Sequence, residues 1–299
     1  MRENFISIPV NSSFSFSECL WFLDRNFDDC LHLITQNGIR KAVQINGKPL
    51  LFELSHKENN LVIKILSENY TSDDKIILRD FVSEWLDLDR DIKPFYQLLR
   101  TDDRLAYMEQ EFEGLRLVGI PDLFEALCWS IIGQQINLTF AYKLKRRLVE
   151  KYGSHIEYNN QVYYLFPSPE FLAQADPSKL REMQFSSKKA EYIIDLAKIF
   201  TTNQLSKDIL KSLPDIVSRH KALTSIRGIG VWTANYALMK SLKELTCIPH
   251  GDTGLMHALY MHEIIEHKKD TLPVENFFKK FAGWESYLVF YLWRSLSKK

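Results

Sequence analysis

Gly228 and Gly230, in the stretch SIRGIG, constrain the fold of this chain more than any other sequence feature. Helix-forming segments flank them, so we expect one helix to end near Leu223 and the next to begin at Val231. Glycine permits backbone angles that other residues avoid and leaves no side chain over the amide groups. The first N–H groups of a helix lack partners and carry positive potential, which suits a phosphate group. A plain helix–turn–helix connection that binds nothing would carry the same glycines.

The pattern of apolar residues along the chain changes near Asp73. Before it, short β-like runs surround the dipeptide Asn46-Gly47, a strong hairpin signal, and a helical segment FSECLWFLDRNF precedes them. After it, apolar residues recur three and four apart, so we expect helices to the end of the chain. The predicted fold class is α+β and mainly α, with a small N-terminal antiparallel sheet followed by a helical region. We place domain boundaries at residues 1–115, 116–230 and 231–299.

Charge and cysteine content narrow the functional classes. Residues 1–120 hold 14 basic and 20 acidic residues, a net charge of −6, while residues 121–299 hold 24 and 18, a net charge of +6. A basic C-terminal part is compatible with a polyanionic partner. The four cysteines form no CxxC pair, so we expect buried thiols instead of a zinc site. No apolar run is long enough for a membrane span, and no secretory signal is recognised, so we expect a cytoplasmic protein, nucleoid-associated if bacterial.

Several segments together resemble a known family. The hairpin and the helix WTANYALM after it resemble the helix-hairpin-helix element of the DNA glycosylase superfamily, and especially AlkA-type DNA-3-methyladenine glycosylase II. IIGQQINLTFAYKLKRRLVEKYG, FPSPEFLAQADPSKLREMQFSSKKAEYIIDLA and GWESYLVFYLW resemble three further family segments in the same order. The resemblance implies base excision repair of alkylated duplex DNA with no organic cofactor. We expect a monomer, since no heptad pattern or extended apolar stripe calls for a protein partner.

Asp252, in the segment PHGDTGL, matches the family's catalytic carboxylate. Its position before an apolar-periodic segment also suits a helix N-cap, and the two roles are compatible. A carboxylate stabilises the positive charge that develops on the sugar when an N-glycosidic bond breaks, and it can also activate the attacking water; both roles remain open. Bifunctional relatives carry a lysine where Trp232 stands here, so the resemblance implies a monofunctional enzyme.

The base pocket is expected to have aromatic walls. Trp232 and Tyr236 lie four apart on one helix face, and the resemblance adds Trp284 in the closing helix and Phe22 near the N-terminus. Electron-rich rings attract a cationic alkylated purine by roughly 0.5–2 kcal/mol. Each of these aromatic residues, taken singly, is more often part of a core.

Further residues are assigned to the DNA contact. We expect the hairpin glycines and Arg227 to face a phosphate, although the family commonly has proline where Arg227 stands. Gln135 is nominated to fill the gap left by a flipped base, with Gln134 and Asn137 as alternatives. The resemblance also implies a monovalent cation on the carbonyls of Thr224, Arg227 and Gly230. The run of Lys143, Lys145, Arg146 and Arg147 either faces phosphate or is a solvated helix face.

Two other functions fit part of the sequence. A glycosylase for oxidised purines would share the hairpin, but the lysine is missing and the expected pocket is aromatic. A DNA-binding protein without turnover would keep the hairpin and would not need Asp252. The intact carboxylate favours the enzyme that releases 3-methyladenine and 7-methylguanine.

Overall fold

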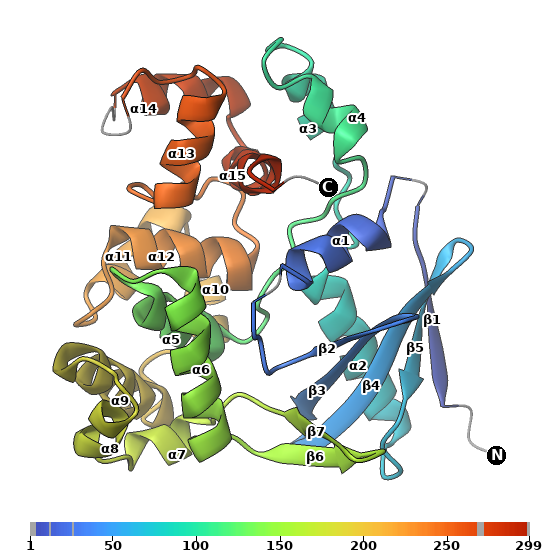
Figure 1. Ribbon diagram of the computed structural model, residues 1–299, viewed down its shortest axis with the longest axis vertical. Helices are drawn as coiled ribbons and strands as arrows, with labels where there is room; N and C mark the ends of the chain where they lie inside the picture. The colour runs from blue at the N-terminus through green and yellow to red at the C-terminus, as the bar shows by residue number, and fades with distance from the viewer. Residues whose placement is uncertain (1–3, 12, 26, 268–271, 298–299) are drawn as a thin grey trace.

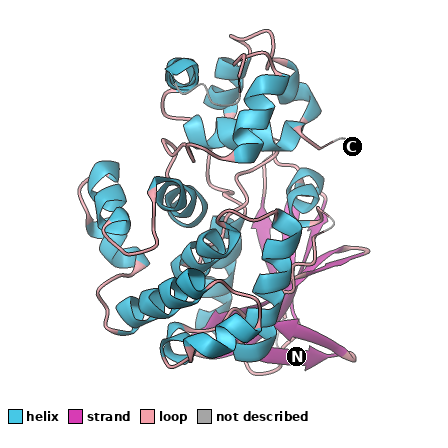
Figure 2. Ribbon diagram, turned by 60° about the vertical axis from the view of Figure 1, so that its left-hand side comes forward, coloured by secondary structure: helices cyan, strands magenta, loops and turns pink. Residues whose placement is uncertain are grey.

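The computed structural model describes residues 4–11, 13–25, 27–267 and 272–297. Strands gather on one side of the molecule and helices form the rest (Figure 2). The predicted α+β fold class is confirmed. No helix in the described ranges combines the length and apolar character needed to cross a bilayer.

The N-terminal part is a five-stranded antiparallel sheet in the order β1-β5-β4-β3-β2. Its strands are β1 (Phe5–Pro9), β2 (Leu33–Thr35), β3 (Gly38–Ile45), β4 (Lys48–Lys57) and β5 (Asn60–Ile65). The predicted hairpin is confirmed: Ile45 pairs with Lys48, and both residues of the Asn46-Gly47 turn have positive φ, as a two-residue turn requires. The N-terminal part of the chain also holds four helices, namely α1 (Phe16–Leu23), α2 (Ser72–Trp85), α3 (Lys93–Leu99) and α4 (Tyr107–Glu111), of which α2 contacts β1 and β3 of the sheet.

The remaining chain is mostly helical. Its helices are α5 (Leu123–Gly133), α6 (Leu138–Tyr152), α7 (Pro169–Ala173), α8 (Pro177–Glu182), α9 (Ser187–Thr201), α10 (Lys207–Ser212), α11 (Ile216–Thr224), α12 (Val231–Ala237), the π-helix η1 (Leu238–Leu242), α13 (Thr253–Met261), α14 (Leu272–Phe278), the 3₁₀-helix η2 (Lys279–Phe281) and α15 (Glu285–Ser295). Helices α5 and α9 contact each other, and α5 also contacts α12 (Figure 1).

The expectation of helices to the end of the chain is wrong at one place. Strands β6 (His155–Tyr158) and β7 (Gln161–Tyr164) form a second hairpin, which contacts β4 and β3 of the main sheet. Asn159 and Asn160 both have positive φ, so they form the same type of tight turn as Asn46-Gly47. The Asn-Asn pair between short β-branched and aromatic runs was the sequence signal for this hairpin.

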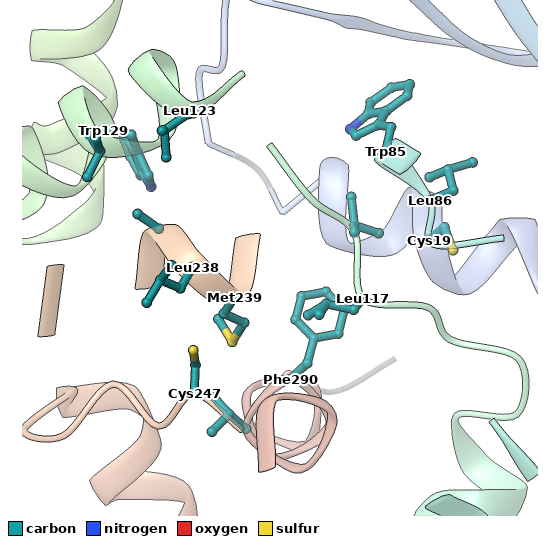
Figure 3. Packing of buried hydrophobic residues seen from close by; sticks show 14 of the residues in the cluster. Cys19, Trp85, Leu86, Leu117, Leu123, Trp129, Leu238, Met239, Cys247 and Phe290 are labelled. Atoms are coloured by element: carbon teal, nitrogen blue, oxygen red, sulfur yellow. The ribbon is translucent and has the colours of Figure 1, made fainter. Parts of the chain in front are cut away.

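One hydrophobic core runs through both parts of the molecule. It includes residues of the sheet, of α5 and of the C-terminal helices, and Figure 3 shows Leu117, Met239 and Phe290 gathered in it. The four cysteines are free and buried, as expected, and burial raises the pKa of Cys19 to about 12. Residues on both sides of positions 115 and 230 contribute to this one core. The domain boundaries expected at these positions therefore stay predictions.

Candidate active site

The glycine hairpin has the predicted form. Helix α11 ends at Thr224 and α12 begins at Val231, with Gly230 as an N-cap that offers no side chain to the first amides. Gly228 has φ of 92°, and a Cβ atom there would lie 2.4 Å from the ring of Tyr192. Glycine is therefore required at 228 for two separate reasons. An open cavity of about 570 Å³ is lined by the hairpin from Thr224 to Gly230, together with Gln134 and Tyr192.

Gln134 fixes the hairpin to the preceding helix pair. Its Nε2 donates hydrogen bonds to the Gly228 carbonyl (3.0 Å) and to Thr233 Oγ1 (3.1 Å). Asn137 caps α6 by accepting a hydrogen bond from the Phe140 N–H. Gln135 is exposed and has φ of 57°, in the left-handed region. The two alternatives for the gap-filling role are thus engaged in structural hydrogen bonds, whereas Gln135 is exposed at the tip of the loop.

Arg227 is placed differently from the sequence expectation. Its guanidinium pairs with Glu191 (2.7 Å) and Asp195 (3.4 Å) on α9 and lies 5.2 Å from the centre of the Tyr192 ring. The expected free cation near the phosphate site is therefore already neutralised by two carboxylates. Arg227 holds the hairpin against α9, and a surface ion pair of this kind contributes at most about 1 kcal/mol.

Asp252 is the N-cap of α13, as predicted. Its Oδ1 accepts hydrogen bonds from the Leu255 N–H (2.7 Å) and from Trp293 Nε1 (2.9 Å), and its Oδ2 accepts one from Trp232 Nε1 (3.2 Å). The helix N-terminus and two indole N–H groups therefore all direct hydrogen-bond donors at this carboxylate. Because Oδ2 accepts one hydrogen bond, it retains a lone pair that can face a reacting sugar or water.

Aromatic rings extend from Asp252 into the molecule. Trp232 stacks on Tyr236 with ring centres 5.3 Å apart, and Trp293 lies 6.3 Å from Tyr236. The Tyr236 hydroxyl accepts a hydrogen bond from Trp129 Nε1 (3.1 Å), and burial raises the pKa of Tyr236. The ring of Tyr236 therefore stays neutral and electron-rich at physiological pH.

Phe22, on α1, lines a large cavity together with Tyr236 and Trp129. The cavity has a volume of about 960 Å³ and lies between the N-terminal sheet and the helical region. Phe22 packs on Phe290 of α15, with ring centres 4.7 Å apart. This volume is at the upper end of the range for small-molecule pockets and exceeds what a single flipped base needs.

Trp284 does not join the residues around Asp252. It stacks on Phe95 of α3 (5.9 Å) and contacts Tyr287 (5.4 Å), at the beginning of α15. Trp293 near the end of the same helix contacts Asp252 instead. The structure thus places Trp293 of the segment GWESYLVFYLW beside Asp252, and the sequence analysis missed this residue although it carried the same signal as Trp284, an aromatic side chain in the closing helix.

The basic run of α6 is mostly paired with protein groups. Lys145 is buried, and its Nζ contacts Asp29 (3.1 Å) and Glu125 (3.4 Å). Arg146 pairs with Asp28 and Glu150, and Arg147 donates to Met183 and Gln184. Only Lys143 of this run is exposed and forms no ion pair or side-chain hydrogen bond with the described part of the chain. Neither a phosphate-binding cluster nor a purely solvated face therefore describes this helix.

The three carbonyls expected to hold a monovalent cation differ in their hydrogen bonding. The Gly230 carbonyl accepts the Ala234 N–H (2.9 Å) within α12. No described N–H donates to the carbonyls of Thr224 and Arg227, which both border the hairpin cavity. Carbonyl oxygens are suitable ligands for a hard cation, so this donor set fits such an ion. Among the described residues, no group of three acidic, histidine or cysteine side chains could hold a metal.

Comparison with known proteins adds independent findings. The sequence model for the HhH-GPD superfamily base excision DNA repair protein matches residues 128–283, and that for the 8-oxoguanine DNA glycosylase N-terminal domain matches residues 30–127. The chain is 36% identical to "DNA-3-methyladenine glycosylase" of Bacillus subtilis, covering 97% of each chain.

Two solved structures share the fold. The 3-methyladenine DNA glycosylase from Archaeoglobus fulgidus superposes with a TM-score of 0.83 at 23% identity, covering 96% of this chain and 97% of that one. The Clostridium acetobutylicum 8-oxoguanine glycosylase/lyase in complex with double-stranded DNA superposes with a TM-score of 0.74 at 21% identity, covering 98% and 94%.

Proposed function

Because the chain belongs to the HhH-GPD superfamily of base excision DNA repair proteins, we propose that it excises alkylated purines from duplex DNA without cutting the backbone. It is a DNA glycosylase, a hydrolase of the N-glycosyl bond. The proposal concerns the substrates, 3-methyladenine and 7-methylguanine, and the way the site acts on them. The Bacillus subtilis relative bears the name of that activity.

One observation carries the proposal: the Asp252 carboxylate, held by two indole N–H groups, lies beside stacked aromatic rings. A base flipped out of the duplex stacks on Tyr236 and its neighbours. Alkylation at N3 or N7 makes the purine cationic, and electron-rich rings attract it. The positive charge also weakens the bond from the base to the sugar, so little acid catalysis is needed.

The chemical step is a hydrolysis. The bond between C1′ and the purine nitrogen breaks, and its electron pair leaves with the base, which neutralises the base's charge. Positive charge develops on the sugar, and the negative charge of Asp252 stabilises it. A water oxygen then bonds to C1′ and loses a proton to Asp252 or to solvent, which leaves an abasic site.

The residues argue against a covalent lyase mechanism. An amine is needed to form a Schiff base with the sugar, and Trp232 occupies the position after the hairpin where such an amine would stand. Because Trp232 donates to Asp252 instead, this position orients the carboxylate. We expect the enzyme to act as a monomer, with the carbonyls of Thr224 and Arg227 holding a monovalent cation that would add positive charge near the DNA phosphate.

The test is release of free 3-methyladenine and 7-methylguanine from methylated duplex DNA. The parent should release both, and Asp252→Asn should bind the same duplex with unchanged affinity while releasing neither. Strand cleavage and covalent trapping by borohydride should be absent. Excision by Asp252→Asn at the parental rate would refute the role of Asp252.

A second candidate is excision of oxidised purines, favoured by the match of residues 30–127 to the 8-oxoguanine DNA glycosylase N-terminal domain. A duplex containing 8-oxoguanine in the same assay separates the two activities. Tight binding of every duplex with no release of any base would instead identify a DNA-binding protein without turnover.

A further inference from the structure

Two cationic side chains lie against the ring of Phe22. The guanidinium carbon of Arg25 is 4.1 Å from the centre of this ring, and Lys240 Nζ is 4.2 Å from it. Both residues line the same large cavity as Tyr236 and Trp129. No described cation lies over the rings of Trp232, Tyr236 or Trp293, so the surroundings of Phe22 differ in charge from those of Asp252.

Neither cation has a carboxylate partner in the part of the chain that the structure describes. Arg25 Nε donates to the Phe22 carbonyl (2.9 Å). Lys240 Nζ donates to the Val118 carbonyl. Lys145 and Lys207, which line the same cavity, do have carboxylate partners, whereas Lys41 donates to the Leu31 carbonyl.

Arg25 has a property that Lys240 lacks. A guanidinium stays protonated at any physiological pH, whereas burial lowers the pKa of Lys240 well below its usual range. Arg25 lies two residues beyond the end of α1, is half-buried and lines the cavity. A base that enters beside Phe22 therefore meets a permanent positive charge.

This charge acts against the aromatic walls. The rings favour a cationic base, while Arg25 repels it and offers N–H donors to a carbonyl oxygen on a neutral base. Two unit charges several ångströms apart near a protein surface change relative affinity by about tenfold or more. The attraction by the rings and the repulsion by Arg25 together determine which damaged bases bind in the pocket.

We propose that Arg25 is a specificity-determining residue that shifts the base pocket away from cationic purines and toward neutral purines bearing an exocyclic carbonyl. The proposal rests on the proposed function, because it requires the flipped base to enter this cavity. Arg25 acts on the charge of the bound base and takes no part in breaking the N-glycosidic bond.

The experiment compares two duplexes that differ in the charge of one base, 7-methylguanine (cationic) and hypoxanthine (neutral), both of which carry a carbonyl at C6. Arg25→Met removes the charge and keeps an unbranched chain, and Arg25→Lys keeps the charge as the matched control. Excision efficiency on each duplex is measured for the parent and both variants. Binding of each duplex is measured with Asp252→Asn added to each protein.

Arg25→Met should raise the ratio of 7-methylguanine to hypoxanthine, in both excision and binding, by about tenfold, and Arg25→Lys should leave it within about threefold of the parent. An unchanged ratio in Arg25→Met overturns the proposal, and an equal loss on both duplexes identifies Arg25 as a DNA backbone contact. If the parent excises neither base, the proposed function fails, while the binding ratio in the Asp252→Asn proteins still tests the role of Arg25.

Discussion

The two indole donors to Asp252 should differ in their importance for base release. Trp232→Phe and Trp293→Phe each keep an aromatic ring and remove one N–H that bonds the carboxylate. Trp232 is the donor to Oδ2, so its loss leaves that oxygen without a protein partner and allows the carboxylate to rotate. After Trp293→Phe, the Leu255 N–H still holds Oδ1 at 2.7 Å.

The structure sets the expected magnitudes. A hydrogen bond to a charged group is worth about 1.5–3 kcal/mol, and about 1.4 kcal/mol corresponds to tenfold in rate. Trp232→Phe should therefore slow base release by about 10- to 100-fold. Trp293→Phe, which leaves both oxygens with a donor, should slow it by less than about tenfold.

The assay is single-turnover release of 3-methyladenine from methylated duplex DNA with enzyme in excess, so that the rate reports the chemical step. Trp284→Phe is the matched control: it removes an indole from the N-cap of the same helix, α15, where the ring packs against Phe95, and it should not change the rate. A larger loss for Trp293→Phe than for Trp232→Phe would refute this account, and so would a large loss for Trp284→Phe.

Substitutions of Gly228 in the hairpin, Gln135 at the loop tip and the buried Lys243 should each change the free energy of unfolding. Gly228→Ala should lower the free energy of unfolding, measured by chemical denaturation, by about 1–3 kcal/mol, because the new Cβ would clash with Tyr192 at a φ of 92°. Gly230→Ala, whose new Cβ would have no atom within 4 Å, should change the free energy of unfolding by at most about 1 kcal/mol. Gln135→Gly should relieve a left-handed backbone and raise the free energy of unfolding by up to about 1 kcal/mol, yet slow excision from duplex DNA more than from single-stranded DNA. Burial lowers the pKa of Lys243 from 10.5 to about 8, so between these values the unfolded chain binds more protons than the folded chain. The free energy of unfolding should therefore rise with pH across this range by about 1–3 kcal/mol more in the parent than in Lys243→Met, as measured by denaturation at each pH.

Local sequence signals predicted the parts of the fold whose geometry is local. The Asn46-Gly47 turn, the hairpin around Gly228 and the N-cap at Asp252 each depend on residues within a few positions of one another. The β6–β7 hairpin carried an equally local signal in Asn159-Asn160, which the helical periodicity around it obscured. Backbone conformations of this kind can be inferred from single residues because sterics at one position decide them.

Charged residues were less predictable. Arg227 lies within the turn, directly before Gly228, and was expected to face DNA, but its partners Glu191 and Asp195 lie more than thirty positions away on α9. Lys145 similarly found its partners on the N-terminal segment and on α5. The sequence indicates that a charged side chain needs either a charged partner or solvent. Which of these it has depends on how elements distant in the sequence pack against it.

The positions of Trp284 and Trp293 relative to Asp252 depended on the tertiary structure, whereas the presence of both residues in the closing helical segment could be inferred from the sequence. The sequence by itself determined that a hairpin, a helix-capping carboxylate and an aromatic closing helix are present in this order. The two tryptophans are nine residues apart, which is two and a half turns of an α-helix, so they lie on opposite faces and toward opposite ends of α15. Either face could have met Asp252. Only the packing of α15 against α3 and α13 turned Trp293 to the carboxylate, because the orientation of a helix about its axis depends on the elements that cover its two faces.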